Sequence, residues 1–334
     1  MVARAGRIVV WILLTPLLAL GILWSAAALW IDGPAARGLA GALAAGFVLG
    51  NLGILWWVRP MRRAVLVVLV LLVAARAWWF AIPPRNDRDW YPDVAQLTTA
   101  TVDGNRLTVR NVRNFDYRSE TDYTERWETR TYDLDQLRGV DLFLSFWGPT
   151  EIAHTIASWE FADGQHLAVS IETRKEKGEE YSAVRGFFRQ YEVYYVVADE
   201  RDVVRLRTNY RGEQAFLYRI RMPPERARAL LLSYVAEINR LAEHPRWYHA
   251  LTHNCTTTIR HHMQEVAPGR PWDWRFLANG HLPELGYERG TIDTSLPFAE
   301  LQRRSDITAR ARAADQDPAF SARIRDGLPG AALR

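Results

Sequence analysis

The sequence is poor in cysteine: Cys255 is the only one among 334 residues, so an intramolecular disulfide is excluded. It also lacks a strong excess of either charge. The formal net charge is +4, and no stripe of Lys and Arg is interleaved with aromatic residues, so nucleic-acid binding has little support. No internal repeat is visible. The informative features are therefore long apolar runs and the surroundings of one thiol.

Long apolar runs are concentrated before residue 84. They cover Ile8–Ile31, 39–58 and 64–80, and each has the length of a membrane-spanning helix. A cleaved signal peptide is a poor alternative, because the first run is too long and two more follow it. We therefore predict that residues 1–84 form a membrane anchor with three transmembrane helices.

Arginines lie before the first run and between the second and third runs. The connection between the first and second runs carries only Arg37, together with Asp32. Cytoplasmic connections are enriched in Lys and Arg, so the N-terminus is predicted to be cytoplasmic. After three crossings, the C-terminal part then lies outside the cytoplasm. The arginines that set this orientation are Arg4, Arg7, Arg59, Arg62 and Arg63.

Residues 85–293 have the pattern of an α+β domain in which an antiparallel sheet precedes the helices. Two Asp-Gly pairs, at 103–104 and 163–164, lie between alternating runs, which is typical of β-hairpins. The strands are expected within the ranges 97–112, 139–148, 154–174, 191–198, 203–210 and 215–222.

Two helices are predicted after the strands. Pro223 and Pro224 introduce an amphipathic helix, and a second helix starts near Cys255. Residues 294–334 are rich in arginine and are predicted to form a charged C-terminal tail.

The sequence around Cys255 predicts a helix cap followed by the thiol. Asn254 is a favourable N-cap residue, which places Cys255 in the first turn. Free N–H groups there favour a thiolate and can also bind an oxyanion on a substrate carbonyl. The plain alternative is a cysteine that only packs in the core.

A nucleophilic cysteine needs a base, and His154 is the preferred candidate. His261 and His262 lie six and seven residues after the cysteine, so the closer-facing His262 is about 10 Å away along a helix. His253 is next to the cap and is expected to point elsewhere. His154 instead opens a predicted strand.

The predicted hairpin also supplies a residue that could orient the imidazole. With a turn at Asp163–Gly164, His154 lies opposite Glu172 or Thr173. Opposite residues in a hairpin have Cβ atoms about 4.5–5.5 Å apart. Glu172 is therefore the candidate that orients His154.

A metal site is the other interpretation of the same segment. It would use His253, Cys255, His261 and His262 as ligands. Their spacing, H-x-C-x5-H-H, matches no zinc-binding pattern, so neither a metal nor another cofactor is expected.

Three long segments resemble the bacterial Lnb N-terminal periplasmic domain family over about Asn111 to Val266. They are "HTIASWEFADGQHLAVSIETRKEKGEEYS", "GFFRQYEVYYVVADERDVVRLRTNYR" and "YHALTHNCTTTI", and the last contains the family's Asn-Cys-Thr-Thr signature at 254–257. The resemblance implies chemistry like that of a lipoprotein intramolecular transacylase. It also implies a papain-like fold of the circularly permuted NlpC type, in which the histidine strand precedes the cysteine helix.

Carried over to this chain, the resemblance supports Cys255 as nucleophile and His154 as base. Glu172 and Arg174 belong to the shared motif. Asn254, Thr256 and Arg174 are expected to support the site or its oxyanion. The membrane would then be the bacterial inner, or cytoplasmic, membrane, with the catalytic domain in the periplasm.

The expected function is a membrane-anchored thiol acyltransferase or hydrolase. It would act on acyl esters of a membrane lipid or lipoprotein through a thioester on Cys255, and it would not bind nucleic acid. Two alternatives stay open: a cell-wall peptidase or amidase, and a non-catalytic envelope domain that binds a lipid or a partner protein.

Overall fold

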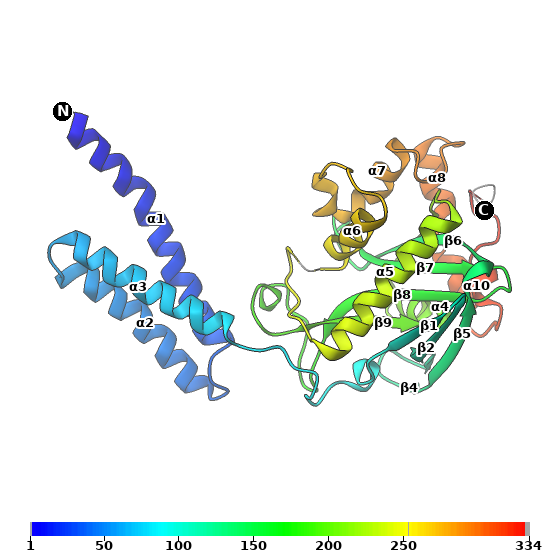
Figure 1. Ribbon diagram of the computed structural model, residues 1–334, viewed down its shortest axis with the longest axis horizontal. Helices are drawn as coiled ribbons and strands as arrows, with labels where there is room; N and C mark the ends of the chain where they lie inside the picture. The colour runs from blue at the N-terminus through cyan, green and yellow to red at the C-terminus, as the bar shows by residue number, and fades with distance from the viewer. Residues whose placement is uncertain (1, 253, 331–334) are drawn as a thin grey trace. The chain divides into compact units, whose positions relative to one another are not determined.

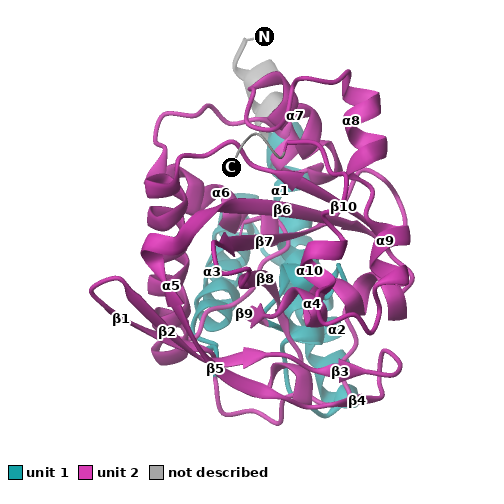
Figure 2. Cartoon of the chain, turned by 90° about the vertical axis from the view of Figure 1, so that its right-hand side faces the viewer, with its two compact units in different colours: residues 1–85, 182–191 teal, residues 86–181, 192–334 magenta. Residues whose placement is uncertain are grey.

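The structure is a computed structural model that describes residues 2–252 and 254–330. The chain divides into two compact units, which are coloured separately in Figure 2. One unit contains residues 1–85 and 182–191, and the other contains residues 86–181 and 192–334. Each unit is described by itself.

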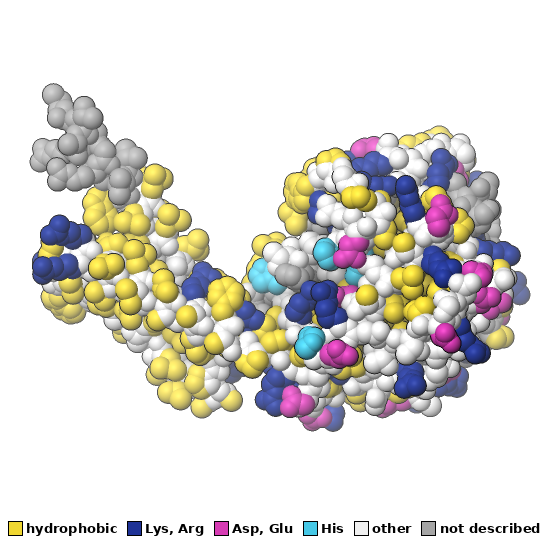
Figure 3. Space-filling model, in the orientation of Figure 1, with side chains coloured by type: hydrophobic (Ala, Val, Ile, Leu, Met, Phe, Trp, Pro, Cys, Tyr) yellow, Lys and Arg dark blue, Asp and Glu magenta, His cyan; other side chains and the backbone are white. Residues whose placement is uncertain are grey.

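Three long helices make up most of the first unit. They are α1 (Val2–Ile31), α2 (Arg37–Trp57) and α3 (Met61–Phe80). Each contains a stretch of 20 or 21 residues that is long and apolar enough to cross a membrane. Hydrophobic side chains cover their surface in Figure 3, as expected where lipid replaces water around a helix. The predicted three-helix anchor is confirmed.

The first unit also includes a segment from the middle of the chain, residues 182–191. Its Gln190 Nε2 donates to Asp32 Oδ1 at 2.6 Å, and Trp79 Nε1 donates to the other oxygen of Asp32 at 2.7 Å. Phe188 stacks on Trp24 with ring centroids 6.0 Å apart. This segment packs against the C-terminal ends of α1 and α3, so the anchor unit is not confined to the predicted residues 1–84.

A mixed sheet forms the centre of the second unit. The strand order is β1-β2-β9-β8-β7-β6-β10, with β5 also paired to β2. All these pairings are antiparallel except β2–β9. The strands are β1 (Thr99–Asp103), β2 (Arg106–Arg113), β5 (Trp127–Asp133), β6 (Leu137–Phe146), β7 (His154–Phe161), β8 (His166–Arg174), β9 (Glu192–Ala198) and β10 (Gln214–Arg219), and a separate small pair is β3 (Asp116–Tyr117) with β4 (Tyr123–Thr124).

Both Asp-Gly hairpins form where the sequence predicts them. Gly104 and Gly164 have φ angles of +58° and +85°, a backbone conformation that favours glycine. The second hairpin joins β7 to β8 in the register that pairs Ile156 with Ser170. Continuing this register by two residues places His154 opposite Glu172.

Side chains alternate between the two faces of the sheet. On one face, Ala157 and Trp159 of β7 pack against α5 (Pro224–Glu243) and α6 (Cys255–Val266). We call this the α6 face, and Figure 1 shows α5 lying across it. On the other face, Ile156 of β7 belongs to a cluster that also contains residues of α4 (Glu200–Arg205), α9 (Thr308–Ala313) and α10 (Phe320–Arg323). We call this the α4 face.

The expected strand at 203–210 is wrong. These residues form the second half of α4 and the π-helical turn η4 (Leu206–Tyr210). Asp199 caps α4 by accepting from the backbone N–H of Arg201 at 2.8 Å. The alternating pattern misleads because Arg205 and Arg207, which look like a solvent-facing row, are both buried in ion pairs.

The predicted C-terminal tail is part of the second unit rather than a separate segment. Ile307, Ala311 and Phe320 are buried in the core of the α4 face. Arg325 lies in the same region and binds Asp141 Oδ2 at 2.8 Å and Glu200 Oε1 at 2.6 Å. The remaining helices are η1 (Pro92–Val94), η2 (Leu134–Gln136), η3 (Arg185–Phe187), η5 (Trp274–Phe276), η6 (Asn279–His281), α7 (Leu282–Glu288) and α8 (Phe298–Ser305).

Candidate functional site

Asn254 caps the helix that carries the only thiol. Its Oδ1 accepts from Thr257 N at 2.9 Å, and Thr257 Oγ1 accepts from Asn254 N at 3.0 Å. This reciprocal pair is a capping box, with threonine in the position that usually holds Glu or Gln. Cys255 is consequently the first residue of α6, as the sequence predicts.

Cys255 lies on the α6 face among aromatic side chains. It is half-buried and packs against the core cluster of that face. Its Sγ is 3.7 Å from Thr256 Oγ1. Burial, with a further contribution from Cys255, raises the pKa of Tyr234 and Tyr248 above the usual range. In the described part of the chain, no histidine or carboxylate contacts this sulfur.

His154 lies on the opposite face of the sheet. It is the first residue of β7, and alternation along the strand places it with Ile156 on the α4 face. Its Nε2 is 2.6 Å from Ser170 Oγ and 3.6 Å from Glu172 Oε1. Burial, together with nearby Arg207, lowers the pKa of His154 to about 3, so the imidazole is neutral near pH 7.

Paired charges continue from Glu172 across the α4 face. Arg207, on the π-helical turn, binds Glu172 at 3.0 Å and Glu213 at 3.2 Å. Ser145 donates to Glu213 at 2.5 Å. Burial alone would raise the pKa of Glu172, but Arg207 outweighs it and holds that pKa well below the usual range. Glu172 is therefore an ionised partner of both Arg207 and His154.

The structure places Glu172 beside His154, as the hairpin register predicts, but it does not bring His154 to Cys255. Their side chains lie on opposite faces of the sheet, because strand alternation directs His154 away from α6. The residues next to them are nevertheless linked by Asn279, whose Nδ2 donates to the side-chain Oγ1 of Thr256 and to the backbone O of Ala153, both at 2.6 Å. No motif in the sequence singles out Asn279.

Arg174 does not support the thiol either. It is buried, and its guanidinium donates to the carbonyls of Val94 and Ala95 at 2.9 and 2.8 Å. It also lies over the ring of Trp90, 4.3 Å from the centroid. Arg174 thus fastens the segment that precedes β1 to the sheet, and the supporting role expected for it at Cys255 is not seen.

The histidines that follow Cys255 along α6 have other partners. His262 is buried between Ser233 Oγ, 2.6 Å from its Nδ1, and Tyr195 OH, 2.8 Å from its Nε2. His261 is exposed and lies 3.4 Å from Glu265. His253 is outside the described residues. Within residues 2–252 and 254–330, no group of three or more His, Cys, Asp or Glu is arranged to hold a metal.

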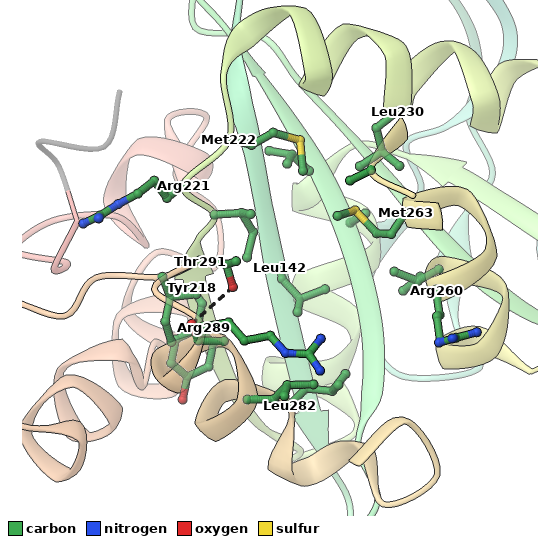
Figure 4. A pocket seen from close by; sticks show the side chains of 18 of the residues that line it. Leu142, Tyr218, Arg221, Met222, Leu230, Arg260, Met263, Leu282, Arg289 and Thr291 are labelled. Carbon is green, nitrogen blue, oxygen red and sulfur yellow. Dashed lines mark hydrogen bonds between the residues drawn. The ribbon is translucent and has the colours of Figure 1, made fainter. Parts of the chain in front are cut away.

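An apolar cavity of about 170 Å³ extends along α6 from the position next to the thiol. Thr256, Ile259 and Met263 of α6 form one wall, and Leu230 and Tyr234 of α5 form another. Residues of β6, β10 and α7 also line the cavity (Figure 4). The sequence predicts that Cys255 lies at the start of a helix, but no local pattern in it indicates this cavity.

The fold and the site define a membrane protein that carries an α+β domain with a capped cysteine helix beside an apolar cavity. Residues 123–280 match the family model of the Lnb N-terminal periplasmic domain. The chain thus contains an Lnb N-terminal periplasmic domain, in agreement with the resemblance found in the sequence, and is a membrane protein with a periplasmic domain. The match includes His154, Glu172 and Cys255. No curated protein and no solved structure matches the chain.

Proposed function

We propose that the periplasmic domain is a cysteine-dependent acyltransferase or acyl hydrolase that acts on lipid or lipoprotein esters at the bacterial inner membrane. The observation that carries this proposal is the position of Cys255 on the first turn of α6, one residue before Thr256, where the lining of an apolar cavity along the same helix begins. The helix N-terminus favours negative charge, and the cavity offers apolar walls to an acyl chain.

The proposed reaction has two steps. The Cys255 sulfur attacks the ester carbonyl carbon, the C–O bond breaks, and the alcohol leaves with the proton that the thiol lost. The resulting thioester is then attacked by an amine or by water, which breaks the C–S bond and gives an amide or a fatty acid. The N–H groups of Cys255 and Thr256 would stabilise the oxyanion, whereas the N–H of Thr257 is already bound by Asn254 Oδ1. Because His154 lies on the other face, it has no part in this proton transfer.

Turnover by the purified full-length protein tests this function. The protein would be incubated with phospholipid and a diacylated lipoprotein peptide, and mass spectrometry would detect either free fatty acid or N-acylated peptide. Cys255→Ser should abolish both products. His261→Ala is the matched control on the same helix, because its side chain is 62% exposed and pairs with Glu265 across the helix surface. Equal turnover by Cys255→Ser and the wild type would refute the proposal.

A second candidate is a non-catalytic domain that binds a lipid. It is favoured by one observation: in the described part of the chain, no histidine or carboxylate contacts Cys255. This candidate predicts that lipid binds equally well to wild type and Cys255→Ser, with no product from either. The same incubation therefore separates the two functions.

A further inference from the structure

The cavity beside α6 has walls suited to an alkyl chain. Met222, Leu230, Met263 and Leu282 contribute apolar side chains from segments that are far apart in the sequence (Figure 4). A cavity of about 150 Å³ in another protein holds benzene, so 170 Å³ accommodates an alkyl segment of comparable size, roughly six carbons. The cavity alone therefore fits part of one acyl chain.

The charged residues around this cavity are almost all positive. Among the described lining residues, four are arginines and only Asp141 is acidic, and the Asp141 carboxylate is bound by Arg325 at 2.8 Å. The four arginines are Arg221, Arg260, Arg270 and Arg289. This excess of positive charge favours a ligand whose apolar chain is joined to an anionic group.

Two of these arginines retain capacity to bind an anion. Arg260 donates to the neutral Gln264 at 3.2 Å and forms no ion pair within the described residues. The nearest carboxylate to Arg289 is Asp273, at 3.9 Å, and that carboxylate already binds Arg275 at 2.9 Å. Figure 4 shows Arg289 extending into the pocket near Leu282, whereas Arg221 points away. Arg289 and Arg260 are thus the candidates for contact with an anionic group.

One residue that lines the cavity, Tyr234, has an unsatisfied hydroxyl group. Tyr234 lines the cavity and is fully buried, and its OH has no hydrogen-bond partner among the described residues. Native structures rarely leave a buried hydroxyl unpaired, because its desolvation is then uncompensated. A ligand with a carbonyl oxygen at this wall would supply the missing acceptor.

We propose that the cavity binds one acyl chain of an anionic membrane phospholipid. The alkyl part lies among Met222, Leu230 and Met263, the phosphate lies near Arg260 and Arg289, and the ester carbonyl accepts a hydrogen bond from Tyr234. The inference rests on the proposed function in that the ester then lies near Cys255. Binding itself requires no thiol chemistry.

Photo-crosslinking of full-length Cys255→Ser in neutral detergent tests this site without turnover. The probes are phosphatidylglycerol and phosphatidylcholine with the same diazirine-bearing acyl chain. We expect phosphatidylglycerol to label peptides of α5 and α6 at least fivefold more than phosphatidylcholine does. Arg260→Ala/Arg289→Ala should remove this preference and leave labelling of α1–α3 unchanged.

Arg303→Ala/Arg323→Ala is the matched control, because it removes the same charge from side chains that are 72% and 60% exposed on α8 and α10. Labelling confined to residues 1–85, or equal labelling by both lipids, would overturn the proposed site. Stronger competition by free fatty acid than by phosphatidylglycerol would also overturn it. If wild-type protein still released fatty acid in any of these cases, the proposed function would be retained and only this lipid site would be rejected.

Discussion

The two faces of the sheet differ in what surrounds their buried polar groups. On the α4 face, Arg325 binds Asp141 and Glu200, and Arg207 binds Glu172 and Glu213. The α6 face instead contains a thiol without a histidine or carboxylate contact among the described residues. It also has an unpaired tyrosine hydroxyl and a cavity rimmed by arginines.

This difference indicates that the α4 face contributes mainly to the stability of the fold, whereas the α6 face is the proposed place for binding. Buried charges in ion pairs hold segments in place, whereas an unpaired polar group beside a cavity can be satisfied by a ligand. The α4 face fastens the C-terminal helices and η4 to the sheet. The α6 face is where we propose that a substrate binds.

The largest expected effect comes from breaking a buried ion pair on the α4 face. Arg325→Met leaves Asp141 and Glu200 buried without their cation, which should lower the free energy of unfolding by about 3–5 kcal/mol. Urea unfolding of the full-length protein in detergent measures this loss. Arg323→Met, in a neighbouring exposed pair, is the control and should change little. Similar losses in both variants would contradict the role assigned to this cluster.

The pH dependence of stability should report the burial of His154. Its pKa in the folded protein is about 3, below the ordinary value of 6.5, so between these pH values the unfolded chain binds more protons. Stability should therefore fall as the pH falls through this window, by up to about 1.4 kcal/mol per pH unit.

His154→Gln should remove the contribution of His154 from the slope of unfolding free energy against pH. Burial also lowers the pKa of His262, to about 4, but His262 is present in both proteins and cancels in the comparison. Unfolding curves between pH 4.5 and 6.5 provide the measurement, and identical slopes for wild type and variant would show that His154 is not buried as described.

Tyr234→Phe tests whether the unpaired hydroxyl on the α6 face serves a ligand and not the stability of the fold. Removing an unpaired hydroxyl should leave the free energy of unfolding unchanged or raise it by about 1 kcal/mol. Acyl turnover should fall about tenfold, equivalent to about 1.4 kcal/mol of transition-state stabilisation. Tyr195→Phe is the matched control, because its hydroxyl bonds His262 at 2.8 Å and its loss should destabilise the fold. Equal stability losses with unchanged turnover would argue against a ligand contact at Tyr234.

The smallest effect is expected at the helix cap. Asn254→Ala removes the acceptor for Thr257 N and should cost about 1 kcal/mol. Hydrogen exchange should then be faster in the first turn of α6, whereas Asn254→Ser should retain most of the protection. Unchanged exchange in Asn254→Ala would mean that the cap does not hold Cys255 in place.

Local signals explain what the sequence could predict. The Asp-Gly turn at 163–164 determines the register of β7 and β8, and hence the proximity of His154 and Glu172. The Asn254 cap likewise places Cys255 at the start of its helix. Three apolar runs were sufficient to predict the anchor helices.

The sequence-based predictions fail where contacts between distant segments determine the structure. Arg205 and Arg207 pair with carboxylates distant in the sequence, so the local pattern predicts a strand where the structure has a helix and a π-turn. The sequence also predicts that His154 acts on Cys255, which the structure does not show. A sequence does not state which face of a sheet a later helix covers. The cavity is lined by residues of α5, α6 and α7, which are brought together by tertiary packing. No local sequence pattern encodes that packing.

The most direct test of the account is the reactivity of the single thiol. Full-length protein would be mixed with phosphatidylglycerol vesicles, quenched in acid and analysed by intact-protein mass spectrometry. The account predicts an added acyl mass on Cys255 that hydroxylamine removes and that is absent in Cys255→Ser. A folded protein that shows no acyl adduct, and whose Cys255 also fails to react with a thiolate-directed probe, would contradict it.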